Sequence, residues 1–306
     1  MSLSDESFEF DVSVIGLGAM GTIMAQVLLK QGKRVAIWNR SPGKAAALVA
    51  AGAHLCESVK AALSASPATI FVLLDNHATH EVLGMPGVAR ALAHRTIVDY
   101  TTNAQDEGLA LQGLVNQAGG HYVKGMIVAY PRNVGHRESH SIHTGDREAF
   151  EQHRALLEGL AGHTVFLPWD EALAFATVLH AHAFAAMVTF FEAVGAGDRF
   201  GLPVSKTARL LLETSRFFVA DALEEAVRRL ETQDFKGDQA RLDVHADAFA
   251  HIAQSLHAQG VWTPVFDAVC QVVQRAAAMG YGDQDIAATT KSFAREQEEG
   301  HHHHHH

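Results

Sequence analysis

The sequence predicts an α/β domain built on a mostly parallel sheet, followed by an all-helical domain. In the first half, short β-branched runs alternate with helical stretches, which is typical of βαβ units and parallel strands. This alternation stops after Pro168, and only helical patterns follow. The chain has 306 residues, which is enough for two domains with hydrophobic cores of their own.

The first predicted domain covers residues 9–168. Its strands are expected at residues 11–15, 34–38, 69–74, 96–100, 122–127 and 164–167. Its helices are expected at residues 21–31, 42–51, 58–64, 104–119 and 147–160. Strands and helices of these lengths, alternating in this way, favour a sheet with crossover helices over an antiparallel meander.

The second predicted domain, residues 169–294, begins with a long apolar helix that joins the two halves. This helix is expected from about residue 170 to residue 200, where Gly201, Leu202 and Pro203 form a stop signal. Further helices are expected at residues 205–213, 215–229, 246–259 and 264–279, and after Asp283. The segment 299–306 is typical of an expression tag and is set aside from the fold.

Composition narrows the possible partners. The net charge of −10 argues against nucleic acid, because no basic stripe is present to neutralise phosphates. Only two cysteines occur, Cys56 and Cys270, without a CxxC motif, which favours a reduced cytoplasmic protein and no zinc–thiolate site. The remaining histidines lack convergent spacing, so we expect no metal. We also expect no membrane span, because the apolar run 172–195 is interrupted by histidines and Glu192.

A glycine-rich segment follows the first expected strand and leads into a helix. It is a G-x-G-x-x-G motif in the strand–turn–helix setting that a dinucleotide-binding (Rossmann) domain requires. The helix N-terminus would present free N–H groups to the pyrophosphate, whereas a simple glycine-rich turn is the alternative. The predicted cofactor-binding residues of this loop are Gly16, Leu17, Gly18, Ala19, Met20 and Gly21.

The end of the second expected strand indicates which dinucleotide binds. NAD enzymes commonly place a carboxylate there, on the ribose 2′-hydroxyl, but residues 38–44 contain none. Arg40 and Lys44 would attract a 2′-phosphate, and Asn39 and Ser41 could donate hydrogen bonds to it. The sequence therefore favours NADP(H), unless Arg40 and Lys44 are simply solvated surface charges.

These motifs, with two later stretches, resemble the β-hydroxyacid dehydrogenase (6-phosphogluconate dehydrogenase) superfamily and, within it, the imine reductases. The later stretches are residues 121–131 and the helical residues 251–283, and the resemblance covers residues 9–290. It implies a Rossmann domain, an interdomain helix and a C-terminal helical bundle. It also implies an NADPH-dependent reductase of C=N bonds that forms a domain-swapped homodimer with each active site between the two chains.

The resemblance leaves the proton donor open. It implies a lysine on the long helix in hydroxyacid dehydrogenases, and an aspartate or tyrosine in imine reductases. Here the matching position falls at Ala176 or Val178, and Thr177 is the only polar side chain in residues 173–179. Alcohol oxidation needs a base for the hydroxyl proton, whereas an iminium ion already carries its proton. The departure therefore favours imine reduction.

Four other side chains are candidates for the cleft. His180 shares a helical face with Ala176 and titrates near neutral pH, although it could be a buried structural histidine. Tyr130 could donate a hydrogen bond or simply pack. Thr101 and Thr102 follow the strand at residues 96–100, where ligands of parallel sheets bind, but could instead cap a helix. His180, Tyr130 and Thr101 are thus the predicted catalytic residues, and the predicted cofactor set is completed by Leu74 and Thr102.

The function predicted from the sequence is NADPH-dependent reduction of an imine or iminium by hydride transfer. One alternative is a 3-hydroxyacid dehydrogenase-like enzyme with an atypical base. Another is an NADP-binding protein without turnover, which the missing helix lysine or aspartate would also fit.

Overall fold

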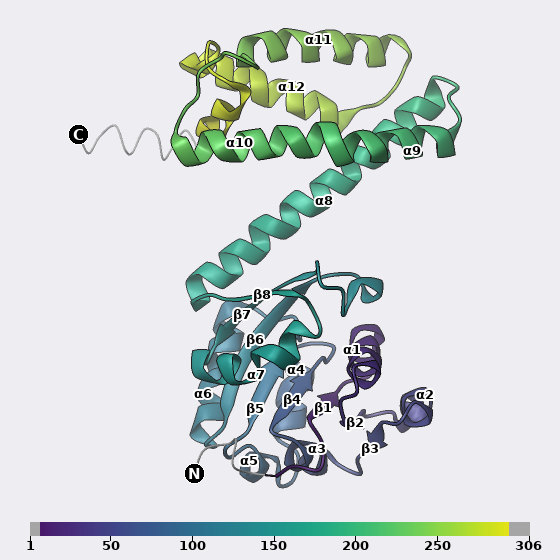
Figure 1. Ribbon diagram of the computed structural model, residues 1–306, viewed down its shortest axis with the longest axis vertical. Helices are drawn as coiled ribbons and strands as arrows, with labels where there is room; N and C mark the ends of the chain where they lie inside the picture. The colour runs from purple at the N-terminus through teal and green to yellow at the C-terminus, as the bar shows by residue number, and fades with distance from the viewer. Residues whose placement is uncertain (1–6, 294–306) are drawn as a thin grey trace, which may run out of the picture. The chain divides into compact units, whose positions relative to one another are not determined.

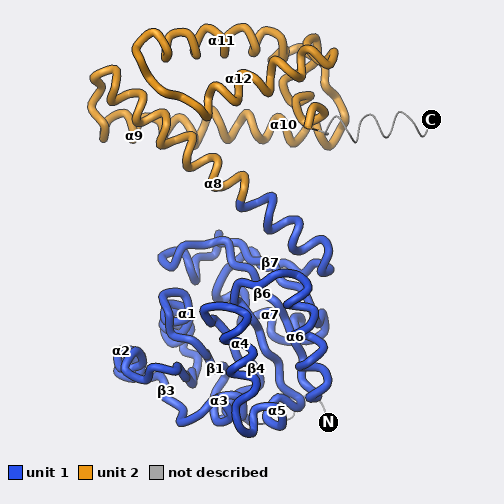
Figure 2. Tube along the Cα trace, turned by 180° about the vertical axis from the view of Figure 1, so that it is seen from behind, with its two compact units in different colours: residues 1–180 blue, residues 181–306 orange. Residues whose placement is uncertain are grey.

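The computed structural model describes residues 7–293 of the chain, in two compact units. Unit 1 comprises residues 1–180 and unit 2 comprises residues 181–306 (Figure 2). The boundary lies within helix α8 (Trp169–Arg199), a dozen residues after the division that the sequence predicts at residue 168. The segment 299–306, expected to be a tag, lies outside the described residues.

Unit 1 is built on an eight-stranded sheet with the order β3-β2-β1-β4-β5-β6-β7-β8 (Figure 1). Its strands are β1 (Val12–Ile15), β2 (Val35–Trp38), β3 (His54–Leu55), β4 (Ala68–Phe71), β5 (Thr96–Asp99), β6 (His121–Val128), β7 (His140–Gly145) and β8 (His163–Phe166). Neighbouring strands are parallel except β6 and β7, which are antiparallel. The strand order reverses between β1 and β4, and this switch point opens a crevice at their carboxyl ends.

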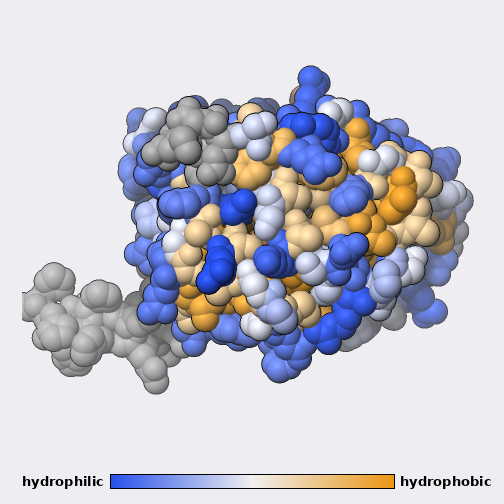
Figure 3. All heavy atoms as spheres, turned by 90° about the horizontal axis from the view of Figure 1, so that it is seen from below, coloured by the Kyte–Doolittle hydropathy of each residue, from blue (hydrophilic) through white to orange (hydrophobic). Residues whose placement is uncertain are grey.

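Helices cover both faces of this sheet, so the strands are buried on two sides. They are α1 (Ala19–Lys30), α2 (Ala46–Ala50), α3 (Val59–Ala65), α4 (Asn76–Leu83), α5 (Val88–Ala91), α6 (Gln105–Gln117) and α7 (Arg147–Glu158). Successive strand residues alternate between two cores, because side chains of a strand point to opposite faces. Val98 and Val123 join the core under α1 and α7, whereas Ile97 and Tyr122 join the core under α3 and α6. On the face that Figure 3 shows, hydrophilic residues are interspersed among apolar ones.

Unit 2 is helical and has a smaller core. After α8, its helices are α9 (Val204–Thr214), α10 (Ala220–Thr232), α11 (Leu242–Ala258) and α12 (Pro264–Ala276). A π-helical turn, Ser215–Val219, connects α9 to α10. The core lies between α11 and α12 and includes Leu242, Val273 and Ala288. Many large apolar side chains on α8, α9 and α10 remain exposed.

The predicted fold class is confirmed, with local differences. The sequence did not predict β3, β7, α4 or α5, and the last expected helix is a 3-10 segment, Ile286–Ser292. From the sequence, we also expected the polar side chains in residues 172–195 to rule out a membrane-spanning length of apolar helix, and this expectation is wrong by length and composition. Helix α8 is long and apolar enough to cross a bilayer by length and composition, with a mean hydropathy of 1.6 over 18 residues. One such helix is weak evidence for a membrane span, because the core helix of a soluble protein meets the same length and composition criterion.

Candidate cofactor and substrate site

The glycine loop between β1 and α1 has the geometry of a phosphate cradle. Gly16 has a φ of 103°, and a Cβ there would lie 2.1 Å from the Val72 carbonyl oxygen. A Cβ on Gly21 would lie 1.9 Å from the Gly16 carbonyl oxygen, so α1 packs directly on the loop. At Gly18, by contrast, a Cβ would meet no atom within 4 Å. The loop is therefore closely packed at Gly16 and Gly21 but open at Gly18. On this open side, the first-turn N–H groups of α1 lack intrahelical partners and could bind a phosphate.

The turn after β2 carries the side chains predicted to select NADP(H). The Asn39 Oδ1 accepts a hydrogen bond from the Leu17 N–H at 3.0 Å, and its Nδ2 donates to the Ser41 carbonyl at 3.0 Å. Asn39 thus joins the turn to the glycine loop. Arg40, Ser41 and Lys44 are exposed, where a phosphate can reach them.

Arg40 already has an anionic partner that the sequence did not reveal. Its guanidinium forms a short ion pair with Glu81 on α4, and His77 Nε2 lies 2.7 Å from the other Glu81 oxygen. The hydrogen bond from Arg40 lowers the pKa of the Glu81 carboxyl. Glu81 therefore stands where it can compete with a 2′-phosphate for Arg40.

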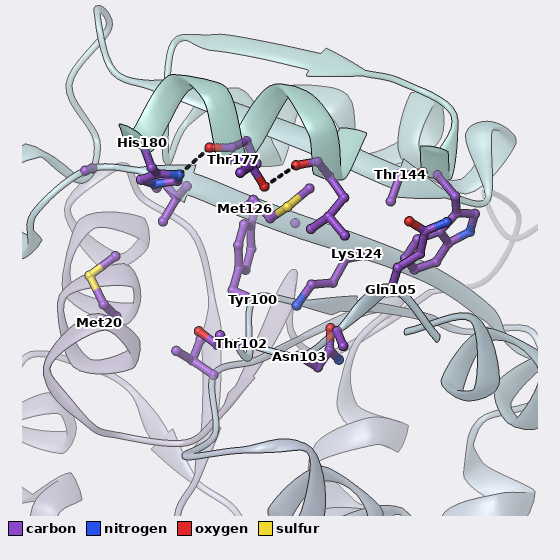
Figure 4. Close-up of a pocket in the computed structure, with 18 of the residues that line it drawn as sticks. Met20, Tyr100, Thr102, Asn103, Gln105, Lys124, Met126, Thr144, Thr177 and His180 are labelled. Atoms are coloured by element: carbon purple, nitrogen blue, oxygen red, sulfur yellow. Dashed lines mark hydrogen bonds between the residues drawn. The ribbon is translucent and has the colours of Figure 1, made fainter. Parts of the chain in front are cut away.

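A cavity of about 510 Å³ opens in unit 1 at the carboxyl ends of the central strands. Its walls come from the first turn of α1, the loop after β5, strand β6 and the start of α8 (Figure 4). The lining residues with functional side chains are Met20, Tyr100, Thr102, Asn103, Gln105, Lys124, Met126, Thr144, Trp169, Thr177 and His180. No carboxylate is among the described residues that line it, so its acid–base chemistry depends on Lys124, His180 and Tyr100.

Lys124 is the charged group of the cavity and is only 5% exposed. Its Nζ donates a short hydrogen bond to the Thr101 carbonyl. Burial lowers the pKa of the Lys124 ammonium, and the charge of Asp99 opposes this shift. Asp99 is itself held in place, because it accepts hydrogen bonds from the Tyr122 hydroxyl at 2.7 Å and from the Thr101 N–H at 2.9 Å.

Tyr100 forms a neutral pair with His143 behind the cavity wall. The Tyr100 hydroxyl lies 2.7 Å from His143 Nε2. Burial raises the pKa of Tyr100 above its ordinary value and lowers the pKa of His143 to about 3. At neutral pH the histidine is therefore uncharged, and its hydrogen bond with the hydroxyl holds the tyrosine ring in place.

The structure separates the predicted catalytic residues. His180 lines the cavity, and its Nδ1 donates to the Ala176 carbonyl at 2.7 Å. Thr101 is buried and its Oγ1 accepts a hydrogen bond from the Leu73 N–H at 2.9 Å, so it fixes the neighbouring strand end. Tyr130 is 46% exposed with the Arg132 guanidinium 4.8 Å from its ring centroid, outside the cavity lining.

Of the remaining predicted cofactor residues, Met20 and Thr102 line the cavity, and Leu74 is 89% exposed after β4. Sequence reasoning missed Asn103 and Lys124. Lys124 had a usable signal, because a lysine in the otherwise apolar strand 122–127 is unusual for a sheet covered on both faces.

Both halves of the chain match models of known protein families. Residues 11–168 match the family model of the NAD binding domain of 6-phosphogluconate dehydrogenase. Residues 171–295 match the model of the NADPH-dependent reductive aminase-like C-terminal domain. The chain is 25% identical over 291 residues to the NADPH-dependent reductive aminase of Aspergillus oryzae, covering 92% of this chain and 96% of that protein.

Solved structures give the same result over both units. An imine reductase from Pseudomonas sp. is similar with a TM-score of 0.83 and 29% identity, covering 94% of this chain and all (100%) of that one. A reductive aminase from Aspergillus terreus, in complex with NADPH and ethyl levulinate, has a TM-score of 0.80 and 27% identity. That match covers 93% of this chain and 99% of the other.

Proposed function

The chain belongs to the family of the NAD-binding domain of 6-phosphogluconate dehydrogenase, in its imine reductase and reductive aminase branch, and we propose that it reduces C=N bonds with NADPH. One observation carries this proposal: a single cavity extends from Met20, at the cofactor loop, to Thr177 and His180 on α8. The long helix offers no lysine at residues 173–179 to act as the base for an alcohol.

The chain has the groups that an NADP(H) molecule needs. Gly18 leaves room for the pyrophosphate, and the exposed Arg40, Ser41 and Lys44 would bind the 2′-phosphate. Met20 and Thr102 belong to both the cofactor side and the cavity, so the reactive end of the cofactor would enter there. When bound, NADPH supplies the hydride that a C=N carbon accepts.

The cavity walls offer surfaces that would position a substrate. Met126, Trp169 and the ring of Tyr100 provide apolar surface, and Asn103, Gln105 and Thr177 provide hydrogen-bonding groups among them. An iminium bound there needs orientation more than acid catalysis. A neutral imine needs a proton as well, and His180 and Lys124 each have a nitrogen that could supply one.

We further propose that two copies of the chain associate. In the π-helical turn before α10, Phe217 is 76% exposed and Phe218 is 69% exposed. Further apolar side chains are exposed along α8 and α9. Apolar surface of this extent marks an interaction site, and a second copy with the same surface would cover it isologously. Light scattering should then give a mass of about twice the 33.0 kDa chain. The buried free thiols of Cys56 and Cys270 suit the cytoplasm.

The activity test follows NADPH consumption with 3,4-dihydroisoquinoline as the imine, with NADH as the control cofactor. Oxidation of 3-hydroxyacids with NADP⁺ and no reduction of imines would instead indicate a hydroxyacid dehydrogenase. Tight NADPH binding without turnover of any imine or carbonyl would indicate a non-catalytic NADP-binding protein.

The cofactor assignment has its own test. Arg40→Ala and Lys44→Ala should each weaken NADPH binding about 10-fold or more, because each removes a charge-assisted contact with the 2′-phosphate. NADH binding should change little in both variants. Lys30→Ala, which removes an exposed lysine at the far end of α1, is the matched control. Unchanged NADPH affinity in both variants would contradict the assignment.

A further inference from the structure

Lys124 is a buried ammonium whose hydrogen-bonding capacity is only partly used. It lies in the middle of β6, in register with Asp99 on β5 and with Thr144 on β7. Its bond to the Thr101 carbonyl uses one of three N–H donors. A buried lysine is costly unless its charge is compensated or used, and such groups concentrate at functional sites. Because the side chain lines the cavity, the other donors are available to a bound molecule.

The position of Lys124 suits a reacting nitrogen. In Figure 4 its side chain extends from β6 toward the loop that carries Thr102 and Asn103. This loop follows the carboxyl end of β5, next to the switch point at which ligands of such sheets bind. His180 and Thr177 approach the same cavity from α8. An imine between these two walls would have Lys124 on its sheet side.

We propose that Lys124 is the catalytic acid that protonates the imine nitrogen in the reaction proposed above. One Nζ–H bond breaks as an N–H bond forms on the imine nitrogen, and the lysine is left as a neutral amine. The resulting iminium carbon accepts the hydride, so the imine is reduced to an amine and NADPH is oxidised. The lysine then regains its proton from water. A lysine on the sheet would thus replace a donor on α8.

The surroundings of Lys124 favour release of its proton. Burial makes the ammonium a stronger acid than free lysine, which brings its pKa closer to the working pH of a general acid. Among titratable groups, the charge of Asp99 on β5 acts on it, and Tyr100 and His180 line the same cavity. Tyr122 is hydrogen-bonded to Asp99, and His143 to Tyr100. Burial raises the pKa values of both tyrosines and lowers the pKa of His143, so these three stay neutral near pH 7.

His180 is the matched alternative within the same cavity. Its Nδ1 donates to the Ala176 carbonyl at 2.7 Å. Lys124 is better placed because its ammonium is fixed next to Thr102 and Asn103, whereas His180 belongs to the opposite wall. A substitution of His180 therefore serves as the control for a substitution of Lys124.

Two substrates separate proton donation from every other role of Lys124. 3,4-Dihydroisoquinoline needs a proton, whereas its N-methyl iminium salt carries a permanent charge and needs none. At a pH above the pKa of the free imine, Lys124→Met should lower kcat for the imine at least about 100-fold and leave kcat for the N-methyl iminium within about threefold. Lys124→Arg should behave in the same way, because it keeps the charge but does not release its proton. His180→Gln should affect both substrates equally.

A second measurement needs no turnover. Neutral and protonated dihydroisoquinoline absorb differently, so the spectrum of the imine bound to the NADP⁺ complex reports its protonation. In the wild-type protein the protonated form should persist above the pKa of the free imine, and in Lys124→Met it should not. Circular dichroism and NADPH affinity should match the wild type in Lys124→Arg, which shows that the fold is intact.

The outcomes distinguish this inference from the proposed function on which it rests. If the wild type reduces neither substrate, imine reduction itself is contradicted. If the wild type reduces both, and Lys124→Met either matches it or loses both activities equally, Lys124 is not the proton donor. Loss of imine reduction alone in His180→Gln would assign the donor to His180 and also overturn the inference.

Discussion

The two units differ in how completely they bury their apolar side chains. In unit 1, two cores sandwich the sheet, and large residues such as Phe71, Met24 and Phe150 are fully buried. In unit 2, the core is small, and Phe191, Phe217 and many others remain exposed. Since burial of apolar surface is the main driving force of folding, unit 1 is stabilised by its own contacts. The exposed apolar side chains of unit 2 would gain further burial in the proposed association.

The two units also differ in how far the protein itself satisfies the hydrogen-bond donors of their buried cations. In unit 2, the Arg229 guanidinium is 1% exposed and its donors bind Asp238 and two backbone carbonyls, with Asp285 3.3 Å away. Its Nε also donates to Glu225, so each of its three nitrogens is bonded inside the unit, which makes Arg229 a structural group. In unit 1, Lys124 has donors to spare and faces a cavity. On this comparison, the proposed chemistry lies in unit 1 and the proposed association in unit 2.

The largest effect is expected at the cofactor loop of unit 1. Gly16→Ala should destabilise the protein by about 3 kcal/mol or more and abolish NADPH binding, because the new Cβ meets backbone atoms at a φ of 103°. Gly18→Ala is the matched control. It fills open space, so it should leave stability within about 0.5 kcal/mol and weaken only NADPH binding. Thermal denaturation measures stability and NADPH titration measures cofactor binding. Equal losses of stability in Gly16→Ala and Gly18→Ala would contradict the described geometry of the glycine loop.

Next in size is the effect of a charge on the exposed face of unit 2. Phe217→Glu should weaken the dimer at least about 30-fold, since removal of a central aromatic contact costs about 2 kcal/mol or more. Light scattering across a dilution series measures this change. Leu114→Glu, at a side chain of α6 that is 42% exposed in unit 1, should leave the mass unchanged. A wild-type protein that is monomeric at every concentration would refute the proposed association.

The same contrast explains what the sequence predicted and what it missed. Gly16, Gly18 and Gly21 act within one turn, so local spacing was sufficient to find them. Strand β7 was missed because residues 139–145 contain serines and histidines instead of a β-branched run, and its pairing with β6 is fixed by the fold. Glu81 and Asp99 were missed for a related reason. Their partners Arg40 and Tyr122 lie 41 and 23 residues away, and such contacts leave no local pattern.

An effect of intermediate size is expected in the pH dependence of the unfolding free energy, to which a buried histidine of unit 1 should contribute more than an exposed histidine of unit 2. The pKa of His143 is lowered from 6.5 to about 3 by burial, so the unfolded chain binds this proton more readily than the folded one. The stabilisation is complete above pH 6.5 and is lost as the pH falls toward 3, by about 2 kcal/mol at pH 5. His143→Gln should make the unfolding free energy less dependent on pH by this amount. The buried His153, whose pKa is lowered to about 4, should supply much of the pH dependence that remains in His143→Gln.

The control for this effect comes from unit 2. His257 is exposed, in contrast to the buried His143, and its Nε2 lies 2.9 Å from Asp267. His257→Gln should leave the loss of stability below pH 6.5 as it is in the wild type. Urea unfolding at several pH values gives these slopes, and equal slopes in His143→Gln and the wild type would mean that another group in unit 1 controls acid unfolding.

The smallest effect is expected at the exposed rim of the cofactor site. Glu81→Gln removes the carboxylate that pairs with Arg40 and would face the 2′-phosphate. NADPH should then bind up to about fivefold more tightly, which is the range of an exposed ion pair, and the gain should shrink at high salt. NADH, without the phosphate, should bind as before. Glu158→Gln, on the exposed face of α7, controls for the change in net charge. Because the phosphate and Glu81 compete for one guanidinium, an NADPH affinity that does not respond to Glu81→Gln would mean that Arg40 keeps its protein partner when the cofactor binds.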